Sequence, residues 1–148
     1  MGLLQIQKMI DSKAVGELGE NIAARYLTNS GYAILEKNYT CKFGEIDIIA
    51  KKGTVLAFVE VKTRTNISYG YPEEAVNKYK IKKIKNTANF FIVNNKPLQD
   101  FNFRFDVISI IADKKIVENA VNANKIKNSV GKKFCSADFN FKHIKDAF

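Results

Sequence analysis

Charged side chains interrupt two neighbouring apolar runs of this chain. Asp47 lies inside the run 46–50. Glu60 lies inside the run 55–61, and Lys62 follows that run directly. Buried strands rarely carry charged side chains unless these are paired or bind a metal. Two carboxylates and a lysine at this spacing therefore predict a magnesium-dependent nuclease site on a β-hairpin.

Each residue has a chemical role in this hypothesis. Asp47 and Glu60 would hold Mg²⁺ through their oxygens, with the backbone carbonyl of Val61 as a further ligand. The bound metal would polarise a phosphoryl oxygen and lower the pKa of its water. Lys62 would neutralise charge that develops on the phosphate. The alternative is a half-buried salt bridge at the edge of a sheet.

The hairpin turn decides whether the carboxylates converge. Both runs are rich in β-branched residues, as strands are. A turn centred on Lys52 and Gly53 pairs Asp47 with residue 58, whereas a turn centred on Gly53 and Thr54 pairs Asp47 directly with Glu60. In either register the two carboxylates share a face, roughly 5–8 Å apart. A turn of odd length would separate them.

The second run is apolar on both faces, which is typical of a central strand covered by helices. Its alternation predicts one face with Val55, Ala57, Val59 and Val61, and another with Leu56, Phe58, Glu60 and Lys62.

Motifs along most of the chain resemble those of the bacterial YraN-like family, within the PD-(D/E)xK, restriction-endonuclease-like superfamily. They are Gly19–Leu27, Gly31-Tyr32, Asn38-Tyr39, Gly44–Asp47, Phe58–Arg64, Tyr69–Pro72, the lysine-rich stretch from Lys80, Arg104–Val107 and His143–Phe148. The superfamily's usual proline before the first aspartate is absent, and Ile46 stands there.

The resemblance implies an α/β fold with a restriction-endonuclease-like core, in which helices flank a central mixed sheet in the order α-β-β-β-α-β. The family is similar to archaeal Holliday-junction resolvases, in which a helix glutamate joins the metal site. The matching residue here is Glu20. The resemblance also implies Mg²⁺ or Mn²⁺ as cofactor, structured or branched DNA as substrate, and a homodimer as one option. The alternatives are a nucleic-acid-binding accessory protein with a vestigial metal site, and a role in RNA processing.

Chain length, net charge, hydropathy and cysteine content limit which of these hypotheses are possible. We expect one domain over residues 1–148. The net charge of +9 favours a polyanionic partner such as nucleic acid, although the lysine excess could also reflect A·T-rich codons. No apolar run is long enough to span a membrane. The two unpatterned cysteines predict a reducing cytoplasm, and His143, the only histidine, is expected to pack near the C-terminus.

The first helix is predicted over 13–29, with Ser12 as N-cap. Its core face would carry Val15, Leu18, Ile22, Tyr26 and Leu27. A strand is predicted over 32–39.

A second helix is predicted to begin near Pro72, with Tyr79 among its buried residues. Five lysines within eight positions, Lys78 to Lys85, predict a ridge that contacts phosphates, although a solvated face is the alternative. Within this interface we expect phosphate contacts from Arg64, Lys80, Lys82 and Lys83. For Tyr69 the options are base stacking, bracing of the backbone and ordinary loop packing.

The C-terminal third is less regular. Residues 101–112 predict a strand, in which Asp106 would have a structural role. Residues 115–121 predict a further strand, and the Asn-, Lys- and Ser-rich stretch 122–140 predicts a mobile basic segment.

Overall fold

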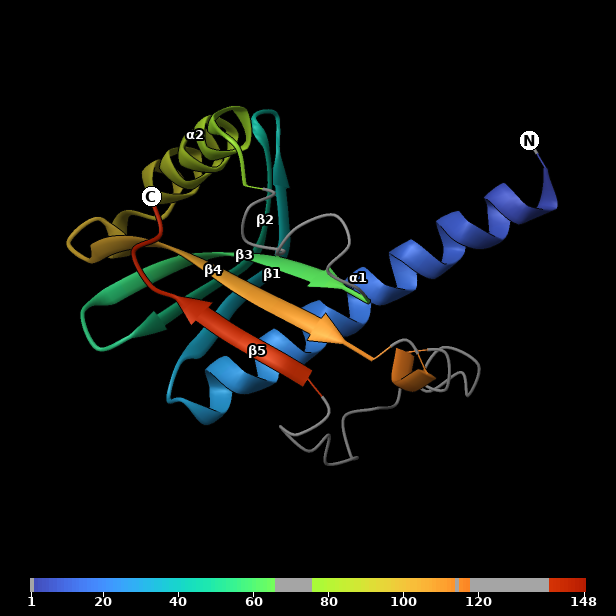
Figure 1. Ribbon diagram of the computed structural model, residues 1–148. Coiled ribbons are helices and arrows are strands. Elements are labelled where there is room, and N and C mark those ends of the chain that lie inside the picture. The colour runs from blue at the N-terminus through green and yellow to red at the C-terminus, as the bar shows by residue number, and fades with distance from the viewer. Residues whose placement is uncertain (1, 66–75, 114, 118–138) are drawn as a thin grey trace.

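The computed structural model describes residues 2–65, 76–113, 115–117 and 139–148 (Figure 1). Its elements follow in the order α1 (Leu3–Asn29), β1 (Ala33–Cys41), β2 (Gly44–Lys52), β3 (Val55–Arg64), α2 (Lys78–Asn94), the 3₁₀ helix η2 (Lys96–Leu98), β4 (Asn102–Ala112) and β5 (Phe139–Ile144). The mixed α/β class is therefore confirmed.

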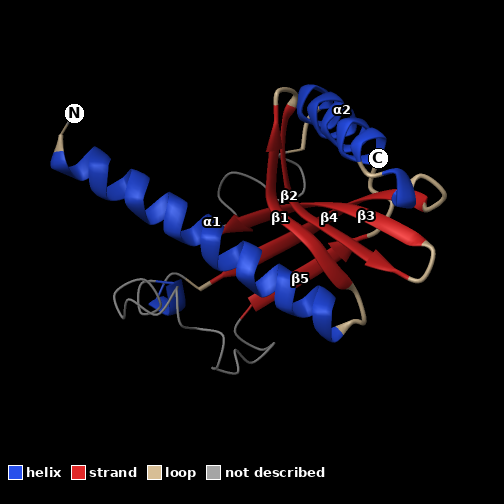
Figure 2. Cartoon of the chain, turned by 180° about the vertical axis from the view of Figure 1, so that it is seen from behind, coloured by secondary structure: helices blue, strands red, loops and turns tan. Residues whose placement is uncertain are grey.

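The strands form one open five-stranded sheet in chain order, β1-β2-β3-β4-β5. Neighbouring strands are antiparallel except β3 and β4, which are parallel because the chain crosses over through α2 between them. The helices cover opposite faces of the sheet, and the view from behind shows α1 lying across the strands (Figure 2). Within the described residues, the helices are too short or too polar to cross a membrane.

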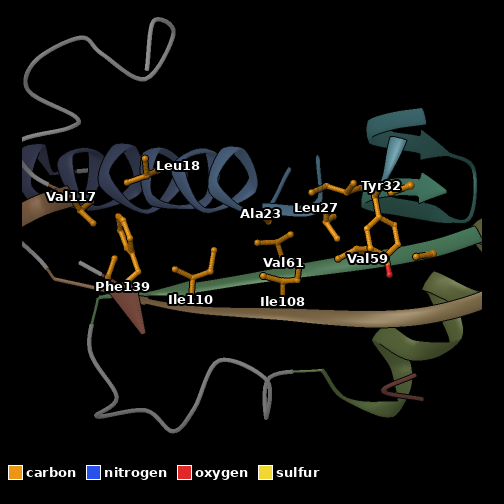
Figure 3. Close-up of a cluster of buried hydrophobic side chains, with 14 residues drawn as sticks. Leu18, Ala23, Leu27, Tyr32, Val59, Val61, Ile108, Ile110, Val117 and Phe139 are labelled. Atoms are coloured by element: carbon orange, nitrogen blue, oxygen red, sulfur yellow. The ribbon is translucent and has the colours of Figure 1, made fainter. Parts of the chain in front are cut away.

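Two hydrophobic clusters hold the helices to the sheet. Beneath α1, Leu18, Ala23 and Leu27 pack on strand residues that include Val59 and Ile108 (Figure 3). Beneath α2, a second cluster contains Ile46, Ile49, Leu56, Phe58, Ile84, Ala88 and Phe91. Full burial of a side chain of this size contributes about 1.5–3 kcal/mol. The strand alternation is confirmed, because Ala57, Val59 and Val61 face α1 whereas Leu56 and Phe58 face α2.

The β2–β3 hairpin adopts the second of the two predicted registers. Its pairs run from Lys52↔Val55 to Ile48↔Val59, so Gly53 and Thr54 form the turn. Gly53 has a φ of +56°, which glycine adopts without strain. One further step in this register sets Asp47 opposite Glu60.

Both helix starts differ from the predictions. α1 begins at Leu3, so Ser12 lies within the helix instead of capping it. No glycine or proline between residues 3 and 12 would end a helix there. α2 begins at Lys78, because the side chain of Asn77 accepts a hydrogen bond from the N–H of Lys80 and caps the helix. The predicted start at Pro72 lies outside the described residues, and residues 76 and 77 are not helical.

The C-terminal predictions are wrong in two places. Residues 115–117 are helical, not extended, and residues 118–121 lie outside the described part of the chain. The prediction of a mobile segment is wrong for residues 139–140, which belong to β5, and residues 122–138 lie outside the described part of the chain. β5 pairs with the edge of β4, and its Phe139 and Phe141, which alternate with exposed Asn140 and Lys142, pack on the cluster beneath α1.

Candidate functional site

Glu60 is a buried carboxylate between two lysines. Its side chain is only 2% exposed. Oε1 lies 2.9 Å from Nζ of Lys62 and 3.3 Å from Nζ of Lys80. Oε2 is buried and has no hydrogen-bond partner among the described residues. An unsatisfied buried oxygen of this kind costs about 1–3 kcal/mol, and more when it is charged, so one side of this carboxylate is suited to a cation.

Asp47 lies beside Glu60. Its Oδ2 accepts a hydrogen bond of 2.7 Å from the backbone N–H of Val61. Burial and, after it, the negative charge of Glu60 raise the pKa of Asp47 to about 7, against the lowering effect of the hydrogen bond from the Val61 N–H. Two such carboxylates repel one another when both are ionised, and a divalent cation between them would remove that repulsion.

Glu20 approaches the same region from α1. Burial is the main cause that raises its pKa, while a hydrogen bond with the Asn38 side chain and the charge of Lys37 lower it. Its charge also raises the pKa of Asp47. Within the described residues, however, no three His, Cys, Asp or Glu side chains are grouped closely enough to hold a metal. The structure thus brings Asp47 and Glu60 together with two lysines, and leaves Glu20 at the periphery, next to Asn38.

Gly19 determines how closely α1 approaches β3. A Cβ at this position would overlap the Thr63 hydroxyl. Thr63 follows Lys62 directly, so the absence of a side chain at Gly19 lets α1 cross β3 next to the candidate site. Glu20 is thereby carried to the periphery of that site. At Gly16, three residues earlier in α1, an added Cβ would have no atom within 4 Å.

The predicted phosphate-binding lysines divide into two groups. Lys80 is directed inward, toward Glu60, whereas Lys82 and Lys83 are exposed. Helical periodicity explains the division, because Lys80 precedes the buried residue Ile84 by one turn. Tyr79, predicted to be buried, is 70% exposed.

The other predicted interface residues are less defined. Arg64 is half-buried at the last position of β3. Tyr69 lies outside the described residues.

Asp106 belongs to a separate buried network. It accepts hydrogen bonds from Arg104, from His143 and from the backbone N–H of Asp146. Burial by itself would raise its pKa, but the hydrogen bonds from His143 and Arg104 outweigh burial and hold the pKa below its ordinary value. Arg104 also donates to the Tyr32 hydroxyl at 2.6 Å. These contacts tie β5 and the C-terminus to β4, in keeping with the predicted structural role of Asp106.

The contact between Lys80 and Glu60 was not predicted from the sequence. These residues are twenty positions apart on different elements. The signal that could have found it is the helical spacing of Lys80 with Ile84, Thr87 and Phe91, all on the face of α2 that meets the sheet.

The comparisons with known proteins assign the family. The model of "Uncharacterised protein family UPF0102" matches residues 19–110. A UPF0102 protein of Clostridium botulinum (strain 657 / Type Ba4) is 49% identical over 113 residues, which cover 76% of this chain and 87% of that protein. A UPF0102 protein of Alkaliphilus metalliredigens is 52% identical over 104 residues, or 70% of this chain and 90% of that one. A third, of Dictyoglomus turgidum, is 46% identical over 106 residues, or 72% and 89%.

The matched region contains α1 from Gly19 onward, the β2–β3 hairpin, α2 and most of β4. It therefore includes the candidate site from Glu20 to Lys80. From this match, and from relatives that are nearly half identical over most of their length, the chain belongs to the UPF0102 family, as its YraN-like motifs predicted.

Proposed function

We propose that this protein is a magnesium-dependent nuclease that hydrolyses phosphodiester bonds in structured or branched DNA. One observation carries the proposal. The half-buried carboxylate of Asp47 and the buried carboxylate of Glu60 converge on adjacent strands, and the ammonium groups of Lys62 and Lys80 lie within 3.3 Å of Glu60.

The donor set fits a hard divalent cation. Mg²⁺ prefers oxygen ligands, and proteins commonly hold it with one or two carboxylates and several waters. The unpartnered Oε2 of Glu60 and the carboxylate of Asp47 would supply the protein ligands. The N–H and C=O of a strand residue point to the same side of the backbone. Because the Val61 N–H points to Asp47, the Val61 carbonyl is directed to the same side, and its oxygen would be the third protein ligand. Glu20 would steady the cation from the periphery through bound water.

Lys62 and Lys80 would bind the phosphate. When bound, Mg²⁺ or Mn²⁺ supplies an activated water and polarises the phosphoryl oxygen. Without a divalent cation, both lysines compensate the charge of Glu60. Once that charge is shared with a cation, Lys62 can hold the oxygens on which negative charge develops. Lys80 can bind the phosphate from the α2 side. Lys82, Lys83 and Arg64 would contribute affinity, as would Tyr69.

The order of elements supports a restriction-endonuclease-like core. The elements from α1 to β4 follow the order α-β-β-β-α-β that the family resemblance implies, and β5 extends that core by one edge strand. The predicted homodimer and cytoplasmic location remain parts of this proposal.

The experiment is a cleavage assay on junction, flap and single-stranded DNA with Mg²⁺ or Mn²⁺. Asp47→Asn and Glu60→Gln should abolish cleavage while binding in EDTA persists. Glu36→Gln, at an exposed position on β1, is the matched control and should cleave like the wild type. Binding without cleavage under any divalent cation would refute the nuclease. That result would favour the accessory protein, which the lack of a three-carboxylate group in the described residues also favours.

A further inference from the structure

Aromatic rings and lysines form an exposed strip along one flank of α2. Cys41 pairs with Gly44, so Lys42 and Phe43 form the tip of the β1–β2 hairpin. This tip lies beside α2 (Figures 1 and 2). We call the following residues the aromatic–lysine strip: Lys42, Phe43, Tyr79, Lys83 and Phe90. Among them, Tyr79 is 70% exposed and Phe43 is 39% exposed.

Close contacts join these side chains. The ring centroids of Phe43 and Phe90 are 5.8 Å apart. Nζ of Lys42 lies 5.1 Å from the Phe43 centroid and 5.8 Å from that of Phe90. Nζ of Lys83 lies 5.2 Å from the Tyr79 centroid. Each exposed ring thus has an ammonium group next to it, an arrangement that offers a ring face and a positive charge together.

The fold holds the strip in one surface. Residues 79, 83 and 90 recur at helical spacing on α2 and so share a face. The hairpin tip is seated against this face at Gly44, where an added Cβ would lie 3.3 Å from Oγ1 of Thr87 and 3.7 Å from Cβ of Lys83. Gly44 also has a φ of +149°, which favours glycine.

The strip begins at the candidate site. Tyr79 directly precedes Lys80, whose Nζ is 3.3 Å from Glu60. Phe90 lies eleven residues after Tyr79 on α2. A helix rises about 1.5 Å per residue, so the strip extends about 16 Å from the site.

This chemistry suits an unpaired strand more than a duplex. Ring faces next to cations bind single-stranded nucleic acid, because the bases stack on the rings while the cations hold the phosphates. In a duplex the bases are already stacked, and the rings would contact only the backbone.

We propose that the aromatic–lysine strip binds an unpaired DNA strand. Bases stack on Tyr79 and Phe43, and phosphates contact Lys42 and Lys83. The proposal deepens the proposed function, on which it rests for the path of the strand to the site, and it assigns the substrate class as DNA with a single-stranded segment.

The first test compares a thymidine oligomer with an abasic oligomer of the same length, by fluorescence anisotropy in EDTA. The wild type should bind the thymidine oligomer at least tenfold more tightly, because the abasic strand has phosphates but no bases. Tyr79→Ala and Phe43→Ala should each weaken thymidine binding about tenfold and leave abasic binding within about twofold. Melting temperatures of both variants check that they fold.

Phe103→Ala is the matched control. Phe103 is 42% exposed, similar to Phe43, but pairs with Leu56 at the end of β3 remote from Glu60. This variant should bind like the wild type. Equal losses in Tyr79→Ala, Phe43→Ala and Phe103→Ala, or equal affinity for thymidine and abasic strands, would overturn the proposal. Tenfold tighter binding of the corresponding RNA would overturn DNA as the occupant.

A second test uses the absence of tryptophan from the chain. Tyr79→Trp introduces a single indole, whose emission the thymidine oligomer should quench and the abasic oligomer should not. Emission unchanged by either oligomer would also overturn the proposal. Because all binding is measured without divalent cations, these outcomes are independent of cleavage. If Tyr79→Trp cleaves DNA normally but shows no such quenching, the role of the aromatic–lysine strip is refuted, whereas the proposed nuclease site is not.

Discussion

The backbone N–H of Val61 donates a 2.7 Å hydrogen bond to the carboxylate of Asp47. The ladder of paired residues between β2 and β3 ends at Ile48↔Val59, two residues before Val61. The Asp47 side chain therefore accepts the hydrogen bond that a carbonyl of β2 would accept if the ladder continued. This bond fixes the carboxylate next to Glu60, as the proposed cation site requires.

Lowering the pH should stabilise the protein in the absence of divalent cations. The pKa of Asp47 is raised from 3.8 to about 7, chiefly by burial and then by Glu60. The folded state therefore binds more protons than the unfolded state between these values, so the free energy of unfolding falls as pH rises from about 4 to 7. The decrease is on the order of 2–4 kcal/mol. Urea unfolding in EDTA across this range should show a clearly shallower slope for Asp47→Asn, and identical slopes would contradict the assignment.

Divalent cations should reverse this loss of stability above pH 7. A cation at 100 times its Kd adds about 2.7 kcal/mol. For a chain of this size that corresponds to a rise of roughly 5–10 °C in Tm. Thermal unfolding with Mg²⁺, Mn²⁺ or EDTA measures the effect. Glu60→Gln should lose most of the rise and Glu36→Gln should keep it. A full rise in Glu60→Gln would exclude this site.

The lysine at the site should act in catalysis, whereas the exposed lysines of α2 should act in nucleic-acid binding. Lys62→Ala should lower kcat about 10²–10³-fold with little change in Kd, because its ammonium stabilises charge that develops during the reaction. The double variant Lys82→Ala/Lys83→Ala should instead weaken binding and reduce the salt dependence of log K by about 2, since exposed lysines contact phosphates. Single-turnover rates and salt titrations separate the two. Similar effects on kcat and Kd in both variants would refute this division.

The two glycines of α1 should respond in opposite ways to alanine. Gly19→Ala forces a Cβ into the Thr63 hydroxyl, and such overpacking costs about 1–3 kcal/mol. It should also weaken Mg²⁺ binding, because α1 must move away from β3 and take Glu20 with it. Gly16→Ala meets no atom and should stabilise the helix by about 0.5–1 kcal/mol. Urea unfolding and cation titration of both variants provide the measurement, and a stable Gly19→Ala protein would contradict the close approach.

Asp106 should affect stability without affecting chemistry. Its side chain is fully buried between Arg104 and His143, so Asp106→Ala leaves an uncompensated guanidinium and should cost about 3–5 kcal/mol. The exposed Asp100→Ala control should change stability by less than about 0.5 kcal/mol. At a temperature where Asp106→Ala is folded, its kcat should equal that of the wild type. A selective loss of kcat would show that Asp106 belongs to the active site.

The amino-acid sequence determined the arrangement that depends on local periodicity. Alternation along β3 put Glu60 and Lys62 on one face, and a two-residue turn at Gly53 and Thr54 was one of two registers that kept Asp47 on that face. The apolar stripe of α1 and the strand 101–112 were also predictable, because each follows from a period of 3.6 or 2 within one element.

Tertiary structure decided the contacts between residues that lie on different helices and strands. The crossover through α2 brings Lys80 to Glu60, and the capping of α2 at Asn77 sets the helical phase that leaves Tyr79 exposed. β5 is extended because the edge of β4 pairs with it, whereas its short Phe-Asn-Phe alternation is too weak a signal alone. Glu20 lies at the periphery of the site because the crossing of α1 over β3 at Gly19 sets its distance. These positions depend on how helices and strands pack against one another, and packing joins residues that are far apart in the chain.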